Sequence, residues 1–255
     1  MPPELPALSW ILLLLAAALA GLAKTALPGA ATIAVALCAA ILPARQSTGL
    51  MLLLLMTGDL LAVRSYWHDA YLVMLRRLVP SVVAGVAAGA LLLHVASDTA
   101  IRRAIGVILL LLIALTLLQR HRSAAPGAPA ATAGHDTASS RPTRLLYGTL
   151  AGLTTMVANA GGPVTSMYFL ACRYPVRAFL GTTAWFFFAV NLVKLPFSIA
   201  IGLVNPTTLA LAAIGAPVVI ASALLGRRLA ERMSQRLFEP IVIALTVLSA
   251  LPLLR

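Results

Sequence analysis

The sequence predicts an all-α polytopic membrane protein built from two inverted repeats, and three observations lead to this fold class. Of the 255 residues 61% are hydrophobic and 10% are charged, which is more apolar side chain than a soluble domain of this length buries. The apolar residues fall in long runs, with room for about eight to ten membrane segments. A pattern of glycine, proline and arginine occurs twice, about half a chain length apart.

The two copies align over most of each half of the chain. At a shift of 132 residues the matching pairs are Gly29 and Gly161, Pro43 and Pro175, Arg45 and Arg177, and Gly49 and Gly181. After a five-residue insertion the shift is 137, and the pairs are Pro80 and Pro217, and Gly89 and Gly226. We therefore expect a first membrane repeat over residues 1–118 and a second over residues 145–255, joined by a linker over 119–144.

Each repeat is expected to contain a broken-helix hairpin followed by three transmembrane helices. The expected helices follow the apolar runs 8–42, 49–63, 78–95, 101–118, 145–171, 180–204, 208–225 and 237–254. The first run of each half contains helix breakers, KTALPG at residues 24–29 and NAGGP at residues 159–163. The 27 residues of 145–171 are too few for two full spans, so we expect a hairpin with two short arms there.

The cationic residues predict the orientation of the two repeats. With five elements per half and both chain ends outside, most arginines fall in cytoplasmic segments, whereas the outside segments carry Arg45, Arg102, Arg103 and Arg255. The loop RSYWHDAYLVMLRR of the first half is basic, but its counterpart NPTT has no charge. The second copy is therefore expected to be inverted, and the linker rich in Ala, Pro and Gly to be a cytoplasmic tether.

Several functional classes find little support in the sequence. The net charge of +12 comes from short arginine clusters between apolar runs, which is typical of a topology signal and not of a nucleic-acid-binding face. The chain has neither H-E-x-x-H nor G-x-S-x-G, and Gly58-Asp59 lacks the first glycine of a G-x-G-D motif. We therefore expect no enzyme, no cofactor and no metal, although His121 and His135 of the linker are the alternative metal ligands.

The two helix breaks predict a binding site for a small anion. A helix that begins inside a membrane has N–H groups without partners and a partial positive charge. Glycine allows close approach of the backbone, and proline suits a first helical turn. If the two tips meet near the middle of the membrane, four half-helix ends surround one site; a pair of kinked buried helices is the alternative. The candidate substrate-binding residues are Lys24, Thr25, Pro28, Gly29, Asn159, Gly161, Gly162, Pro163, Thr182, Thr183, Asn191 and Lys194.

Ionisable residues inside membrane runs are functional candidates because each costs about 2.5–3.5 kcal/mol to insert. Lys24 could neutralise an anion directly, and Lys194 shares a helical face with Asn191. For both lysines, extension of the side chain to the membrane surface is the alternative. Asp59, the repeat counterpart of Asn191, could pair with Arg64 as a structural contact or serve as a proton-coupling carboxylate.

The stretch GTTAWFFFAVNLVKLPFSIAIGLV over residues 181–204 resembles the G-T-[ST]-A, N-x-x-K and G signature of the sulfite exporter TauE/SafE family of bacterial membrane permeases. The NAGGP tip, TGDLLAV at 57–63 and GRRLAERMSQRLF at 226–238 support the resemblance, which covers nearly the whole chain outside the linker. One departure is GLAKTALPGA, where the family commonly has G-x-G-G-G. With Lys24 in this place, the substrate could differ from that of relatives.

The resemblance implies a secondary transporter in the bacterial inner membrane that moves a small sulfur oxyanion or an organosulfonate, such as sulfite or sulfoacetate. Its partners are then a small anion, possible coupling protons and the lipid bilayer, without nucleic acid. Alternating access of the two halves is the expected mechanism. An anion channel and a membrane assembly factor are the alternatives from other classes, and an intramembrane enzyme is disfavoured.

Overall fold

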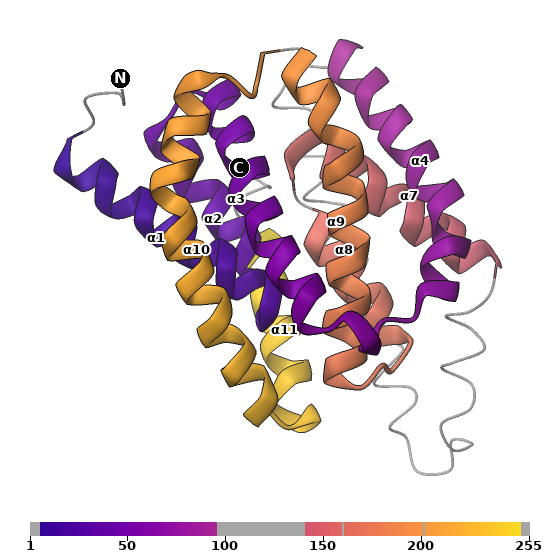
Figure 1. Ribbon diagram of the computed structural model, residues 1–255. Coiled ribbons are helices and arrows are strands. Elements are labelled where there is room, and N and C mark those ends of the chain that lie inside the picture. The colour runs from indigo at the N-terminus through magenta and orange to yellow at the C-terminus, as the bar shows by residue number, and fades with distance from the viewer. Residues whose placement is uncertain (1–5, 96–140, 160, 201, 251–255) are drawn as a thin grey trace, which may run out of the picture. The chain divides into compact units, whose positions relative to one another are not determined.

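The computed structural model describes residues 6–95, 141–159, 161–200 and 202–250, and within these ranges the chain is helical, without strands. In the first half, helix α1 (Ala7–Thr25) is followed by α2 (Ala30–Ile41), α3 (Ala44–Ser65), the short 3₁₀ helix η1 (Trp67–Asp69) and α4 (Leu72–Val95) (Figure 1). In the second half the helices are α7 (Arg141–Ala158), α8 (Gly161–Ala171), α9 (Val176–Ala200), α10 (Pro206–Arg232) and α11 (Gln235–Ala250). The predicted all-α membrane fold is confirmed. The expected span 101–118 and the linker residues 119–140, with His121 and His135, lie outside the described residues.

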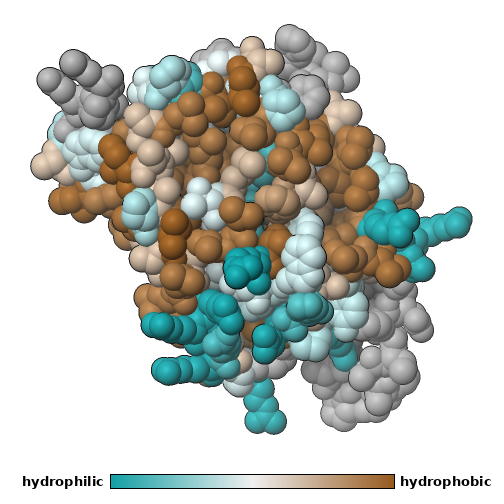
Figure 2. All heavy atoms as spheres, in the orientation of Figure 1, coloured by the Kyte–Doolittle hydropathy of each residue, from teal (hydrophilic) through white to brown (hydrophobic). Residues whose placement is uncertain are grey.

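Within the described residues, five helices are long and apolar enough to cross a membrane, namely those over Ala7–Thr25, Gln46–Ser65, Leu72–Gly89, Val176–Ala200 and Pro206–Arg232. Large apolar side chains such as Leu8, Ile11, Val193 and Leu225 are more than half exposed. Hydrophobic side chains cover most of the coloured surface in Figure 2. An exposed apolar surface of this extent is typical of a protein that is surrounded by lipid. The chain is therefore a multi-pass membrane protein.

Both predicted helix breaks are present. Helix α1 ends at Thr25 and α2 begins at Ala30, because Pro28 has no N–H to donate and disfavours helical backbone at the residue before it. Helix α7 ends before Asn159, whose positive φ of 51° is the left-handed conformation that commonly terminates helices, and α8 begins at Gly161. The expectation of two short arms is wrong for this hairpin, because α7 begins at Arg141, inside the predicted linker, and has 18 residues against 11 in α8.

Turn chemistry also fixes the ends of the long helices. Pro43 precedes α3 and Pro175 precedes α9, so the first turn of each helix follows a residue that cannot donate a backbone hydrogen bond. Asn205 caps α10, since its side chain accepts from the Thr208 N–H at 3.0 Å and its own N–H donates to the Thr208 hydroxyl at 2.9 Å. Pro206 occupies the first turn of α10, where a missing N–H costs nothing.

The chain divides into two compact units that each combine segments of both halves. Unit 1 comprises Met1–Tyr71 and Val176–Phe238, and unit 2 comprises Leu72–Pro175 and Glu239–Arg255. Unit 1 thus holds α1, α2 and α3 together with α9 and α10, and α1 packs against α2, α3 and α10. Unit 2 holds α4, α7 and α8, and in it α7 packs against α4 and α8.

Glycines lie at close helix contacts in both units, as is typical of helices that associate in lipid. In unit 1, Gly21 of α1 lies against the backbone of Val219 and Ala223 and the side chain of Ser222 in α10. In unit 2, Gly152 of α7 lies against Val82–Val86 of α4. Gly21 and Gly152 are 131 residues apart, and the contacted segments are 137 apart.

A second glycine pair repeats the relation. Gly226 of α10 approaches Thr25 and Leu22 of α1, whereas Gly89 of α4 approaches Met156 and Leu153 of α7. The glycines are again 137 apart and their partners 131 apart. The α1/α10 and α4/α7 helix pairs therefore share one contact pattern at equivalent positions.

Candidate anion-binding site

A buried carboxylate lies at the centre of unit 1, between a lysine and an asparagine from other helices. The Lys24 Nζ atom of α1 is 2.7 Å from Asp59 Oδ1 of α3, and Asn191 Nδ2 of α9 donates to Asp59 Oδ2 at 2.8 Å. Asp59 is fully buried, and Asn191 is 2% exposed. Because both carboxylate oxygens have a polar partner, the charge of Asp59 is compensated within the membrane segment.

The Lys24 side chain reaches Asp59 because a glycine leaves space beside it. A Cβ atom on Gly58 would lie 2.9 Å from Lys24 Cγ, so any larger residue would displace the lysine stem. The ammonium group also lies over the Phe187 ring, 4.5 Å from its centroid. The negative face of an aromatic ring attracts a cation, so Phe187 is a second partner for this charge.

One face of α9 carries the remaining polar groups of this cluster. Thr183, Phe187, Asn191 and Lys194 are spaced by four, four and three residues, which places them on one side of a helix. Lys194 is 6% exposed and interacts electrostatically with Asp59 and Lys24. Among the described residues Lys24, Asp59 and Lys194 are the only buried charged side chains. With all three ionised, the two lysines and one aspartate leave a net charge of +1.

Both lysines are therefore placed inside the protein, and the alternative in which they extend to the membrane surface is wrong. The alternative pairing of Asp59 with Arg64 is also wrong, because Arg64 is exposed while Asp59 pairs with Lys24. The predicted shared face of Asn191 and Lys194 is present. Sequence reasoning missed Phe187, although its position four residues before Asn191 was a usable signal.

The three candidate threonines of unit 1 have different environments. The Thr25 hydroxyl donates to the Gly21 carbonyl of its own helix at 3.2 Å, and the Thr182 hydroxyl accepts from the Tyr71 N–H at 3.0 Å. The Thr183 hydroxyl is buried and has no hydrogen-bond partner among the described groups. Because an unsatisfied buried hydroxyl is costly, Thr183 is the threonine with the clearest capacity to bind a ligand.

The first helix break forms a buried tip beside this cluster. Pro28 and Gly29 are buried, and Ala26 and Ala30 on either side of the break are almost fully buried. The tip lies beside the end of α3 and the last third of α10, because Thr25 contacts both Tyr66 and Gly226. Helix α1 is thus a nearly full-length arm of 19 residues, while α2 is a short arm of 12.

The second helix break belongs to unit 2. Asn159 takes the left-handed conformation that ends α7, and Gly161 and Gly162 at the start of α8 are buried. Pro163 lies in the first turn of α8. The Thr165 hydroxyl donates to the Gly161 carbonyl at 2.9 Å. A joint site of the two tips stays a prediction, and so does the binding role of Asn159.

The described residues contain no cluster of His, Cys, Asp or Glu that could hold a metal ion. A family model described as sulfite exporter TauE/SafE matches residues 13–253 of the chain. This match spans α1 to α11 and includes every residue of the Lys24, Asp59, Asn191 and Lys194 cluster. No curated protein and no solved structure gives a significant match.

Proposed function

The chain belongs to the sulfite exporter TauE/SafE family, and on this basis we propose that it is a secondary transporter for a small sulfur oxyanion or organosulfonate such as sulfite or sulfoacetate. The family is one of membrane transporters for sulfur anions and not of enzymes. We further propose that the protein binds the anion at a defined site, couples its movement to a proton, works by alternating access and resides in the bacterial inner membrane.

The burial of two lysines with a single carboxylate in unit 1 is the observation that carries the proposal. Lys24 and Lys194 face a single carboxylate, Asp59, inside helices that are long enough to cross a membrane. Charged side chains buried among membrane-spanning helices are costly and are functional candidates by default. A bound anion completes the charge balance, with the two ammonium groups and the Thr183 hydroxyl as its donors.

The Lys24–Asp59 ion pair offers a route for coupling to protons. When an anion binds Lys24, it competes with Asp59 for the same ammonium group, 2.7 Å away in the structure. Loss of that partner favours the neutral form of a buried carboxyl group, so Asp59 takes up one proton. One proton then accompanies each anion, and its release when the anion leaves restores the ion pair.

Alternating access is supported by the two helix breaks and by the repeated glycine contacts. Helix pairs α1/α10 and α4/α7 use glycines at equivalent positions, which is the expected property of an internal duplication. We propose that the repeats over residues 1–118 and 145–255 have opposite orientations in the membrane. Their movement opens the binding site alternately to the two sides of the membrane. The backbone N–H groups of the second tip, from Asn159 to Pro163, are proposed as anion donors of unit 2.

Flux into proteoliposomes tests the proposed function. Labelled sulfite uptake is expected to saturate with concentration and to lead to accumulation above the outside level when a proton gradient is imposed. A sulfoacetate series measured in parallel compares the two substrate classes. Uptake that rises in proportion to concentration, without accumulation, would instead identify a channel and overturn the transporter assignment.

A further inference from the structure

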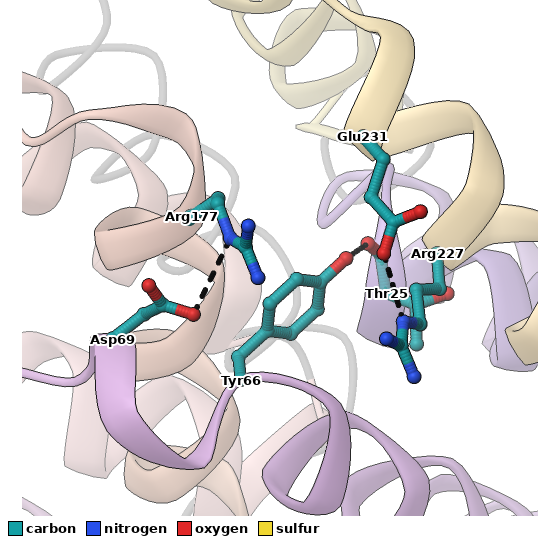
Figure 3. Close-up of polar contacts among 6 residues, drawn as sticks. All are labelled: Thr25, Tyr66, Asp69, Arg177, Arg227 and Glu231. Atoms are coloured by element: carbon teal, nitrogen blue, oxygen red, sulfur yellow. Dashed lines mark hydrogen bonds and ion pairs between the residues drawn. The ribbon is translucent and has the colours of Figure 1, made fainter.

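A buried tyrosine ties the end of α1 to the end of α3. Tyr66 follows the last residue of α3 and is 1% exposed. Its hydroxyl donates to the Thr25 carbonyl of α1 at 2.8 Å (Figure 3). This bond joins two segments that are 41 residues apart in sequence. It was not anticipated from the sequence, since Tyr66 lies in a loop between two apolar runs.

The accepted carbonyl belongs to a helix end that requires a partner. The last carbonyl groups of a helix have no N–H partner within the helix, and burial makes an unmet carbonyl costly. Thr25 is the last residue of α1 and is fully buried, so Tyr66 supplies a donor that solvent does not. Lys24 is the preceding residue. Helices α1 and α3 are therefore linked twice, by the Lys24–Asp59 ion pair and by the Thr25–Tyr66 hydrogen bond.

The loop that carries Tyr66 is also fastened to α9. A Cβ atom on Gly181 of α9 would lie 2.9 Å from the Tyr66 carbonyl oxygen, so glycine is required at this contact. The Tyr71 N–H donates to the Thr182 hydroxyl, and Asp69 Oδ2 is 3.4 Å from Arg177 Nε. Helix α9 carries Asn191 and Lys194, so this loop contacts all three helices of the buried cluster.

The hydroxyl of Tyr66 is suited to a permanent donor role. Burial, reinforced by the negative charge of Glu231, raises the pKa of Tyr66 to about 12, so the group keeps its proton at physiological pH. Figure 3 shows the tyrosine between two ion pairs, Asp69 with Arg177 and Glu231 with Arg227. These pairs are partly exposed, whereas the hydrogen bond to Thr25 is buried. Of the three polar contacts in Figure 3, the hydrogen bond to Thr25 is the one that holds α1.

We propose that Tyr66 is a positioning residue of the anion site, which holds the last carbonyl of α1 and thereby sets the distance of Lys24 from Asp59 and from the bound anion. The inference rests on the proposed function for its effect on substrate. Its structural part, the restraint of the α1 end, is independent of transport.

Two measurements on Tyr66→Phe test this role, because phenylalanine keeps the ring and removes the donor. Amide hydrogen exchange in residues 22–27 of the purified full chain is expected to accelerate. The KM for labelled sulfite in proteoliposomes is expected to rise about threefold to tenfold with an unchanged Vmax per folded protein, which is the scale of one lost hydrogen bond. Tyr71→Phe is the matched control, since the Tyr71 side chain is half exposed in the same loop, and both values should stay at the wild-type level.

The outcomes separate this inference from the proposed function. Wild-type exchange in residues 22–27 of Tyr66→Phe overturns the inference, whether or not the protein transports sulfite. A lower Vmax with an unchanged KM also overturns it, because a purely structural role reduces the active amount and leaves the site intact. Absence of saturable uptake in the wild type would refute the proposed function alone, and the exchange measurement would still decide the restraint of α1.

Discussion

Helices α1 and α10 of unit 1 meet at Gly21 and Gly226, and helices α7 and α4 of unit 2 meet at Gly152 and Gly89. The contacts are equivalent, but the residues beside them are not. The counterpart of Lys24, 131 positions later, is Thr155, which is also buried. Similarly, the carboxylate of Asp59 corresponds to the amide of Asn191, and these two side chains contact each other. The duplication preserves packing, while charge is placed in unit 1.

Packing and binding therefore depend on separate physical constraints. Glycines at helix contacts are fixed by the space between backbones, which both units share. Buried charges are costly in each unit and are expected only where a ligand or a partner compensates them. Substitutions at the glycine contacts are therefore expected to alter stability, whereas substitutions at the buried charges are expected to alter transport as well.

The largest expected effect comes from making the first tip resemble the second. Lys24→Thr introduces the residue of the equivalent position in unit 2 and removes a charged donor from the anion. We expect sulfite uptake to fall about 10- to 100-fold, the scale of one hydrogen bond to a charged group. Transport in proteoliposomes measures this fall. Thr155→Ser in unit 2 is the control, and equal losses in both variants would contradict the assignment of the charge site to unit 1.

A second large effect concerns stability. Asp59→Leu leaves Lys24 buried without its carboxylate, which is expected to cost about 3–5 kcal/mol of unfolding free energy. The double variant Lys24→Met/Asp59→Leu removes both charges and is expected to recover most of that loss, as thermal unfolding in detergent would measure. Neither variant should transport. A transport-active double variant would show that the pair serves the fold alone.

The shared glycine contacts predict matched, smaller effects. Gly21→Ala and Gly152→Ala each place a methyl group against the facing helix, so each is expected to destabilise by about 1–3 kcal/mol. Ala213→Val on α10 and Ala84→Val on α4 are controls, because both positions are exposed. Unfolding midpoints measure all four variants. Destabilisation in one unit only would break the proposed equivalence of the two helix pairs.

The smallest expected effect is at Thr183. Thr183→Val keeps the shape of the side chain and removes a buried hydroxyl that has no partner among the described groups. Stability should be unchanged or slightly higher, because an unsatisfied polar group is lost. If the hydroxyl binds the anion, the KM for sulfite rises about twofold to tenfold. A wild-type KM would remove Thr183 from the site.

The sequence predicted the features that depend on local chemistry. The helix breaks at KTALPG and NAGGP, the all-α membrane fold and the burial of Lys24 and Lys194 follow from proline, glycine and the cost of charge in lipid. Pairings that depend on three-dimensional packing could not be predicted. Lys24 meets Asp59 because Gly58 leaves space for its stem, and Tyr66 reaches Thr25 because α1 and α3 end side by side. The expected partner Arg64 was the nearest cation in sequence, but it is exposed.

Sulfite binding to the purified protein tests most directly the claim that the buried charges of unit 1 form the anion site. The titration compares the wild type with Lys194→Met and with Arg228→Met, in which an exposed arginine of α10 is removed. The account predicts saturable binding in the wild type and in Arg228→Met, and loss of binding in folded Lys194→Met. Equal affinity of Lys194→Met and the wild type would contradict it.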